Sequence, residues 1–214
     1  MITYESIRLK LRKIYIKATL KYRRKKIIND DFTIISNNCW GGFIYQSYGL
    51  EYKTPTIGLF FMAEDYIKFV YNIKKYIDLK LEFIEPSETK YIDYFENHDK
   101  FGEYPIGKLG DIEIHFLHYK SEEEAFDKWN RRVKKINWDR ILFKFNDQNL
   151  CTLDLIEKFS KLPVENKICF TSKECDYDNV YHIKSFYKNS NIKASYEPFG
   201  ESKYLNINKL INKL

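Results

Sequence analysis

The stretch ILFKFNDQNLCTLDLIEKFSKLPVENKICF, residues 141–170, holds the pattern that decides the fold. Its first five residues and residues 167–170 form largely apolar runs, with the length and composition typical of buried strands. Between these runs, Thr152 occupies the N-cap position of a helix that we expect to end near Ser160. Two buried strands joined by a helix form a βαβ unit, and such units build parallel sheets with helices on their faces.

The same alternation of strands and helices extends outward in both directions. Residues 111–117 predict a strand, and Ser121 with Glu124 gives the capping-box pattern of a helix expected to end near Ile136. The other segments are expected as strands at 32–35, 56–62 and 180–183, and as helices at 4–28, from Gly41-Gly42 to Gly49, and at 64–77. Residues 85–110 are expected as loop, with room for a short helix. The sequence therefore predicts an α/β fold of three layers, with a mostly parallel sheet flanked by helices.

The chain has the size and composition of a single domain. Its 214 residues are 44% apolar, which is enough for a sizeable core. We expect one domain over 1–214, made of a basic helix at 1–28, a sheet-and-helix core at 32–184 and a C-terminal extension at 185–214. No apolar run is long enough to span a membrane, no secretory signal pattern is present, and the four cysteines lack paired spacing. These features predict a cytoplasmic protein and leave open a position at the inner face of the membrane.

The first 28 residues carry the positive charge. They hold ten Lys and Arg against one Glu, a net charge of +9, whereas the whole chain is +6 and the remainder is therefore −3. An apolar stripe at helical spacing makes the expected basic helix amphipathic, and it consists of Ile7, Leu11, Ile14 and Ala18. Either this stripe packs on the domain and the charges are solvated, or residues 4–28 contact an anionic membrane. Nucleic acid is disfavoured as a partner, because no aromatic stacking platform accompanies the basic segment.

Short polar runs follow four of the predicted strands. In an open α/β sheet, ligands bind beyond the carboxyl ends of the strands, so these runs are candidates for a pocket. The substrate-binding candidates are Ser36, Asn37, Asn38, Trp40, Gly41, Gly42, Tyr119, Asn146, Thr171 and Lys173. Each run alone also fits a turn or a helix cap, and only their coincidence favours a pocket. We expect this pocket to hold a sugar- or phosphate-containing small molecule.

The run from Ser36 to Gly42 is the most informative of the four. A strand followed by two Asn residues and by Gly41-Gly42 at a helix start can direct backbone N–H groups at an anion. The amides of Asn37 and Asn38 suit sugar hydroxyls, and Lys173 suits a phosphate. The run matches neither G-x-G-x-x-G nor a P-loop, which disfavours NAD binding and simple ATPase activity.

Three residues are candidates for catalysis. Asp147 is a candidate general base, and together with Asn146 it is a candidate to hold Mg²⁺ beside the phosphate of a nucleotide-sugar. His118 is better placed than His115 for acid/base chemistry, because it lies further past its predicted strand. Cys39, at a helix start, is a candidate nucleophile or, in the alternative, a small buried residue. No metal-ligand spacing occurs in the sequence, so we expect no metal site built by the protein alone.

The order and spacing of these residues resemble a bacterial family of unknown function, known as DUF family 1919. The resemblance covers about residues 32–171 and rests on Ser36-Asn37-Asn38-Cys39-Trp40-Gly41-Gly42, Gly58-Leu59-Phe60, Tyr104-Pro105-Ile106-Gly107, His118-Tyr119, Lys128-Trp129-Asn130-Arg131-Arg132, Asp147 and Phe170-Thr171. Members of that family are often labelled exopolysaccharide or capsule biosynthesis proteins. The resemblance therefore implies a cytosolic role where surface polysaccharide is assembled at the membrane. It implies no established activity and assigns no catalytic residues.

Two functions from different classes fit this sequence. The first is a transferase that acts on an activated sugar or glycan precursor in exopolysaccharide or capsule biosynthesis. The second is a non-catalytic protein that binds a glycan precursor or acts as a scaffold for the assembly machinery. A structure in which Asp147 and His118 point into one pocket would favour the enzyme, whereas positions that are both dispersed and solvated would count against it.

Overall fold

The computed structural model describes residues 4–96, 98, 101–186 and 188–214, and it confirms the α/β fold. The larger sheet, sheet A, has four parallel strands in the order β1-β5-β6-β7. These strands are β1 (Thr33–Ser36), β5 (Ile141–Asn146), β6 (Lys167–Thr171) and β7 (Val180–His182). The helices are α1 (Tyr4–Arg24), α2 (Trp40–Tyr48), α3 (Ala63–Tyr71), α4 (Ile73–Asp78), α5 (Ile92–Phe95), α6 (Glu122–Val133), α7 (Leu153–Ser160) and α8 (Ile207–Lys213).

The predicted βαβ unit is formed by β5, α7 and β6. The hydroxyl of Thr152 accepts a hydrogen bond from the main-chain N–H of Leu155 at 3.3 Å, which starts α7 where the sequence predicts it. In the same way, Ser121 caps α6 by accepting from the main-chain N–H of Glu124 at 3.2 Å. Local capping chemistry therefore sets both helix starts.

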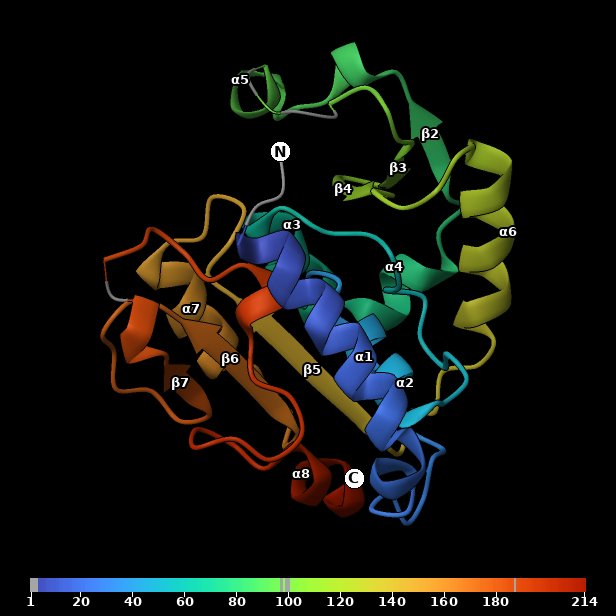
Figure 1. Cartoon of the computed structure of the whole chain (residues 1–214). Coiled ribbons are helices and arrows are strands. Elements are labelled where there is room, and N and C mark those ends of the chain that lie inside the picture. The colour runs from blue at the N-terminus through green and yellow to red at the C-terminus, as the bar shows by residue number, and fades with distance from the viewer. Residues whose placement is uncertain (1–3, 97, 99–100, 187) are drawn as a thin grey trace.

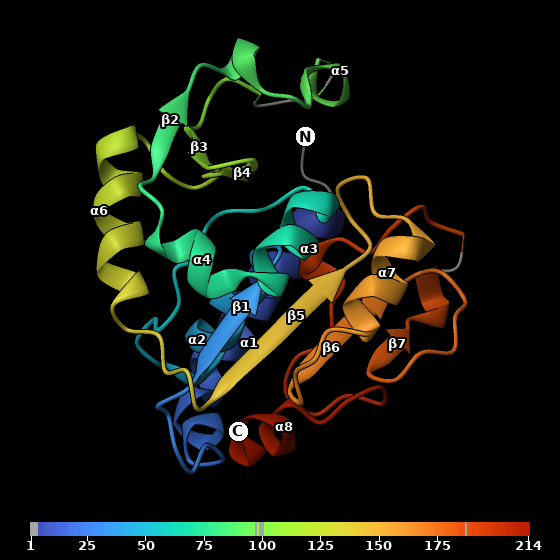
Figure 2. The same ribbon diagram turned by 180° about the vertical axis from the view of Figure 1, so that it is seen from behind.

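Helices cover both faces of sheet A and give the predicted three layers (Figures 1 and 2). Neighbouring strand residues point to opposite faces, so Ile34 and Leu142 join the apolar cluster under α2 and α8. Ile35 and Phe143 join the cluster under α3 and α7. Figure 1 shows α1, in blue, lying across the near side of the molecule next to α2. None of the described helices is both long enough and apolar enough to cross a membrane.

A second, antiparallel sheet, sheet B, departs from the sequence-based expectation. Its strands are β2 (Glu82–Ile84), β3 (Ile106–Leu109) and β4 (Ile112–His115). β3 and β4 form a hairpin whose turn is Gly110, with φ 60°, and Asp111. The predicted strand at 111–117 therefore belongs to sheet B and not to the parallel sheet. The expected strand at 56–62 is wrong, since this segment forms only an isolated bridge between Phe60 and His115.

Sheet B and α6 pack against the rest of the molecule through aromatic side chains. The Trp129 ring of α6 lies 6.3 Å from that of Phe116, which follows β4, and 6.4 Å from that of Phe69 in α3. The helix expected at 64–77 is divided into α3 and α4 at Asn72, whose φ of −134° is not helical. The connection from β1 to β5 thus carries sheet B and brings the turn at 118–119 beside α2.

Candidate functional site

Lys144 stands at the centre of a buried polar network on the α2 face of sheet A. It lies in the middle of β5 and is fully buried, while Phe143 and Phe145 point to the opposite face. Its Nζ lies 2.5 Å from Oε1 of Glu197, which is also buried. Burial lowers the pKa of Lys144 and raises the pKa of Glu197, and the charge of each partner acts in the opposite direction. Each of these charges therefore depends on the other for its compensation.

Side-chain amides complete this network. Asn38 Oδ1 accepts from Lys144 Nζ at 2.9 Å, and Asn38 Nδ2 donates to Glu197 Oε2 at 3.3 Å. Asn37 Nδ2 donates to Asn146 Oδ1 at 2.9 Å. The structure thus brings together the polar runs that follow β1 and β5, as the topology of a parallel sheet requires.

The C-terminal part of the chain closes this network from outside. The amide of Asn146 donates to the main-chain oxygen of Ile192 at 2.9 Å, and the indole N–H of Trp40 donates to that of Pro198 at 2.7 Å. Glu197 belongs to the same segment. Three residues predicted to bind substrate from an open pocket, Asn38, Trp40 and Asn146, are therefore buried and bind the protein's own residues 192–198.

Asp147 lies at the edge of the network and is also buried. Its Oδ2 accepts from the N–H and the hydroxyl of Ser172 at 2.6 and 2.7 Å and from the hydroxyl of Thr171 at 3.2 Å. Its Oδ1 accepts from the main-chain N–H of Ile192 at 2.8 Å. Binding Mg²⁺ or taking a proton from a substrate would require these hydrogen bonds to break. Lys173 points elsewhere and donates to the main-chain oxygen of Cys151 at 2.7 Å.

The start of α2 is bonded within the protein. Asn38 Oδ1 accepts from the main-chain N–H of Trp40 at 3.0 Å, and the hydroxyl of Ser36 donates to the main-chain oxygen of Asn38 at 2.9 Å. A Cβ on Gly41 would lie 3.3 Å from Ile34 Cγ2, so this glycine permits close packing of α2 on β1. The anion site expected at the Gly41-Gly42 helix start is thus partly taken up by an internal cap.

An open cleft of about 500 Å³ lies between α1, α2, α6 and the turns at 57–58 and 118–119. Its walls combine apolar, polar and basic side chains, namely Leu9, Phe43, Tyr52 and Ile57, then Cys39, Gln46, His118 and Tyr119, and finally Lys13, Lys128 and Arg132. His118 is exposed to solvent in this cleft. The structure therefore brings His118 and Cys39 together and leaves Asp147 in the buried network.

Hydrogen bonds hold the turn that carries His118 and Tyr119 in place. The main-chain N–H of His118 donates to the oxygen of Gly58 at 2.9 Å, and the hydroxyl of Tyr119 donates to the oxygen of Ile57 at 2.5 Å. Arg132 Nη1 in turn donates to the Tyr119 hydroxyl at 2.6 Å. Gly58 has a φ of 71°, and a Cβ there would lie 3.3 Å from both His118 and Tyr119. A glycine is required at this position for both reasons.

Cys39 is partly exposed on the cleft wall, and its sulfur lies 3.9 Å from the main-chain oxygen of Leu59. Burial raises the pKa of the Cys39 thiol to about 11, with a smaller opposing effect from Lys144. The thiol is therefore neutral near pH 7, whereas a nucleophilic cysteine acts as the thiolate. This electrostatic environment gives Cys39 no activation.

Several residues of these two sites escape prediction from sequence. Lys144 has a recognisable signal, because a lone lysine within the apolar run 141–145 must be paired if the strand is buried. Glu197, its partner, carries no such signal in a segment without clear periodicity. Lys128 and Arg132 fit a solvated helix face by sequence, yet α6 turns both toward the cleft.

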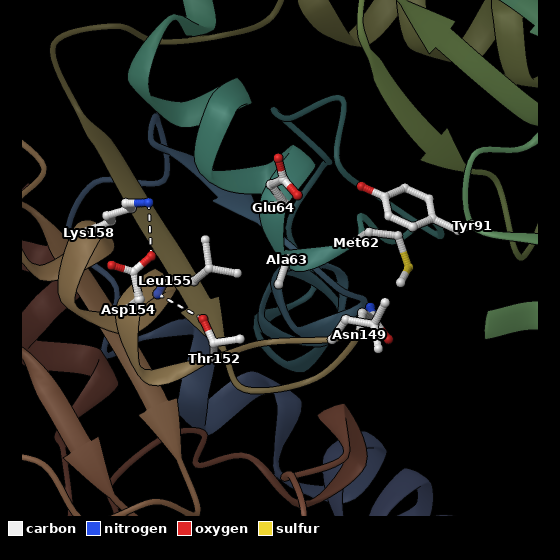
Figure 3. Close-up of a pocket in the computed structure, with 10 residues that line it drawn as sticks. Met62, Ala63, Glu64, Tyr91, Asn149, Thr152, Asp154, Leu155 and Lys158 are labelled. Atoms are coloured by element: carbon white, nitrogen blue, oxygen red, sulfur yellow. Dashed lines mark hydrogen bonds and ion pairs between the residues drawn. The ribbon is translucent and has the colours of Figure 1, made fainter. Parts of the chain in front are cut away.

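A separate pocket of about 320 Å³ lies at the starts of α3 and α7. Figure 3 shows Tyr91 and Met62 on one side of it and Asp154 with Lys158 on the other. Lys158 Nζ lies 2.9 Å from Asp154 Oδ2, and Asn149 adopts a left-handed φ of 58°. The pocket contains none of the predicted site residues, and acidic side chains already compensate both helix starts.

Comparison with known proteins gives two kinds of relatives. An uncharacterised protein of Haemophilus influenzae is 31% identical over 189 residues, which are 88% of this chain and 84% of that protein. Protein VP3 of rotavirus A is 24% identical over 157 residues, and a second rotavirus VP3 is 26% identical over 132 residues. These matches cover 70% and 58% of this chain but only 18% and 15% of VP3.

The family that carries the description "Domain of unknown function (DUF1919)" matches residues 10–213, nearly the whole chain. This range includes α2, the buried network and every residue of the cleft except Leu9. The protein therefore belongs to the DUF1919 family.

Proposed function

We propose that the protein is a transferase that acts on a phosphate-activated sugar or glycan precursor in surface-polysaccharide biosynthesis. The observation that carries this proposal is the cleft in which His118 lies with Lys13, Lys128 and Arg132. Positive side chains suit a phosphate or diphosphate, with which they form charge-assisted hydrogen bonds. The sugar is proposed because the sequence resembles a family whose members are often labelled exopolysaccharide or capsule biosynthesis proteins.

The cleft has the size and composition for such a ligand. About 500 Å³ lies within the range of small-molecule sites. Phe43 and Tyr52 offer apolar surface to a base or sugar ring, and Arg132 is held by its hydrogen bond to Tyr119. A guanidinium held in this way can receive a phosphate with little further loss of side-chain freedom.

His118 is the candidate catalytic residue of this cleft. In the proposed reaction, the acceptor hydroxyl oxygen forms a bond to the anomeric carbon while the bond from that carbon to the phosphate oxygen breaks. His118 takes the proton of the hydroxyl, and the basic side chains stabilise the charge that develops on the departing phosphate. Mg²⁺ would enter with the diphosphate of a nucleotide-sugar, since Asp147 is bonded within the buried network.

The second candidate is a non-catalytic glycan-precursor-binding or scaffold protein. Two observations favour it, namely the location of Asp147 outside the cleft and the raised pKa of the Cys39 thiol. Of the three predicted catalytic residues, His118 is the one whose side chain is exposed in the cleft. The same cleft would then hold the precursor without turning it over.

A binding screen tests the cleft itself. We expect a nucleotide-sugar, free nucleotide or sugar phosphate, with or without Mg²⁺, to raise the melting temperature of the purified protein. Lys13→Gln and Lys128→Gln should each weaken binding about tenfold, the loss of one charge-assisted contact. Lys80→Gln, an exposed lysine that does not line the cleft, is the matched control. Failure of every such anion to bind would contradict the proposal.

Turnover separates the two candidates. If the protein is a transferase, His118→Asn should lower kcat by about 100-fold or more and leave the ligand Kd nearly unchanged. His98→Asn removes a histidine that does not line the cleft and should leave kcat unchanged. Tight binding without release of nucleotide or phosphate, over all acceptors tested, would assign the binding or scaffold function.

A further inference from the structure

The apolar stripe of α1 faces solvent. Ile7 is 48% exposed, Leu11 61% and Ile14 65%, so the side chains that give the helix its amphipathic pattern do not pack on the domain. Ala18, the fourth member of the stripe, is exposed as well. The alternative in which this stripe closes the core is therefore wrong for the observed orientation of the helix.

Arginines fasten the opposite side of α1 to the domain. Arg8 and Arg12 both donate to the main-chain oxygen of Ser195, at 2.9 and 2.8 Å. The Arg8 guanidinium lies 3.7 Å from the ring centre of Tyr196, and that of Arg12 lies 4.2 Å from that of Phe199. Turning the stripe inward would break all of these contacts, so the orientation of the helix is fixed by chemistry on its inner side.

Exposed lysines border the outward stripe. Lys10, Lys17 and Lys21 of α1 are all exposed. At about 100° per residue, the positions around the helix axis follow one another as Lys17, Lys10, Lys21, Ile14, Ile7, Ala18 and Leu11. Beyond Leu11 come Tyr22 and Tyr15, which are 65% and 56% exposed. The outer face thus has a lysine border, an apolar centre and a tyrosine border.

We propose that this outer face of α1 is a docking surface for an anionic lipid bilayer, on which the helix lies parallel to the membrane plane. The apolar centre would enter the boundary between headgroups and acyl chains, and the lysines would contact anionic headgroups. Tyrosine is favoured at the same depth. A ridge along one helix is convex and carries charges of one sign, which fits a deformable anionic surface better than the pocket of a folded partner.

This docking would place the candidate cleft at the membrane surface. Leu9 and Lys13 belong to α1 and also line the cleft, so the helix is shared by both sites. If the proposed function holds, the docked protein would take a phosphate-linked sugar whose other end is a lipid in the bilayer. The docking surface itself does not depend on that function.

Sedimentation with vesicles tests the docking surface on the full chain. We expect the protein to bind vesicles of phosphatidylcholine with about 30% phosphatidylserine and to bind pure phosphatidylcholine at least tenfold more weakly. Leu11→Asn with Ile14→Asn should lower partitioning at least tenfold, because two apolar side chains leave the interface. Phe126→Asn with Leu153→Asn changes two exposed apolar residues on α6 and α7, and this matched control should bind like wild type.

The charge contribution has its own matched pair of variants. Neutralising border lysines should lower binding at least tenfold at about 0.05 M salt and much less at about 0.5 M, whereas neutralising three lysines elsewhere should not. The test variant combines Lys10→Gln, Lys17→Gln and Lys21→Gln. The control variant combines Lys80→Gln, Lys134→Gln and Lys161→Gln. No binding by wild type, or equal loss in variant and control, would overturn the proposal. A dimer that dissociates on changing Leu11 and Ile14, without vesicle binding, would also overturn it and assign the face to a second copy.

Discussion

His115 shows how a histidine near a predicted site can have a purely structural environment. Its ring is stacked 4.7 Å from that of Phe60 and lies 4.8 Å from that of Phe95. Neither ring nitrogen has a hydrogen-bond partner among the described residues, and the side chain is buried. Burial lowers the pKa of His115 to about 3, with a smaller effect from the charge of Lys90.

We predict that this histidine makes the protein less stable in mild acid. In the unfolded chain the imidazole binds a proton below about pH 6.5, whereas in the folded protein it stays neutral down to its lowered pKa. The free energy of unfolding therefore decreases as the pH is lowered from about 6.5 to that pKa. Between pH 7.5 and pH 5 the loss should be about 2 kcal/mol larger for wild type than for His115→Phe. Urea unfolding at the two pH values measures it. Parallel profiles for wild type and His115→Phe would contradict the prediction.

Single residues also show where sequence reasoning ends. The Asn residues after β1 and β5 were expected near one another and are within hydrogen-bond distance. Their partner Glu197 lies 53 residues beyond Lys144 in a segment that has no periodic pattern. No local rule links those two positions. A charged residue in a buried strand predicts that an oppositely charged partner exists, but only the three-dimensional structure shows which residue is that partner.

At the scale of the element, α2 offers a test of its packing on β1. A Cβ on Gly41 would lie 3.3 and 3.4 Å from atoms of Ile34 and Ser36, whereas a Cβ on Gly42 would have no contact closer than 3.6 Å. Alanine is favoured over glycine in a helix by about 1 kcal/mol. We therefore predict that Gly42→Ala stabilises the protein by about 0.5–1 kcal/mol and that Gly41→Ala is less favourable by at least about 1 kcal/mol. Equal free energies of unfolding for the two variants would show that β1 yields to the added methyl group.

Elements with strong local signals were predictable, and elements that depend on distant partners were not. Thr152 and Ser121 cap their helices as expected, because an N-cap is a contact between residues three apart. The hairpin at Gly110-Asp111 has a recognisable turn signal, but it lies in a stretch rich in Gly and Pro that also predicts loop. The apolar stripe of α1 is present as predicted, but periodicity alone does not show whether it faces the domain or the solvent. Its direction is set by Ser195 and Tyr196, far along the chain.

At the scale of the whole molecule, the ion pair between Lys144 and Glu197 ties the C-terminal segment to sheet A. We predict that Glu197→Ala lowers the free energy of unfolding by about 3–5 kcal/mol, because it leaves a buried lysine without a partner. Glu201→Ala removes an exposed partner of Lys26 and should cost far less, because solvent screens an exposed ion pair. Urea unfolding compares the two.

A second variant keeps this prediction testable if Glu197→Ala fails to fold. Lys144→Met with Glu197→Leu removes both charges together and should recover most of the lost stability. Limited proteolysis should also cut Glu197→Ala faster than wild type between residues 188 and 206. Similar losses for Glu197→Ala and Glu201→Ala would mean that Lys144 finds compensation elsewhere.

The closure of the sheet by residues 192–198 has a consequence for how the protein is made. A ribosome adds about 5–20 residues per second, so about 3–10 s separate the synthesis of Lys144 from that of Glu197. During that interval the nascent chain holds a lysine in its central strand with no counter-ion, and the strand cannot be buried stably. Stable burial of β5 therefore awaits the synthesis of residues 192–198.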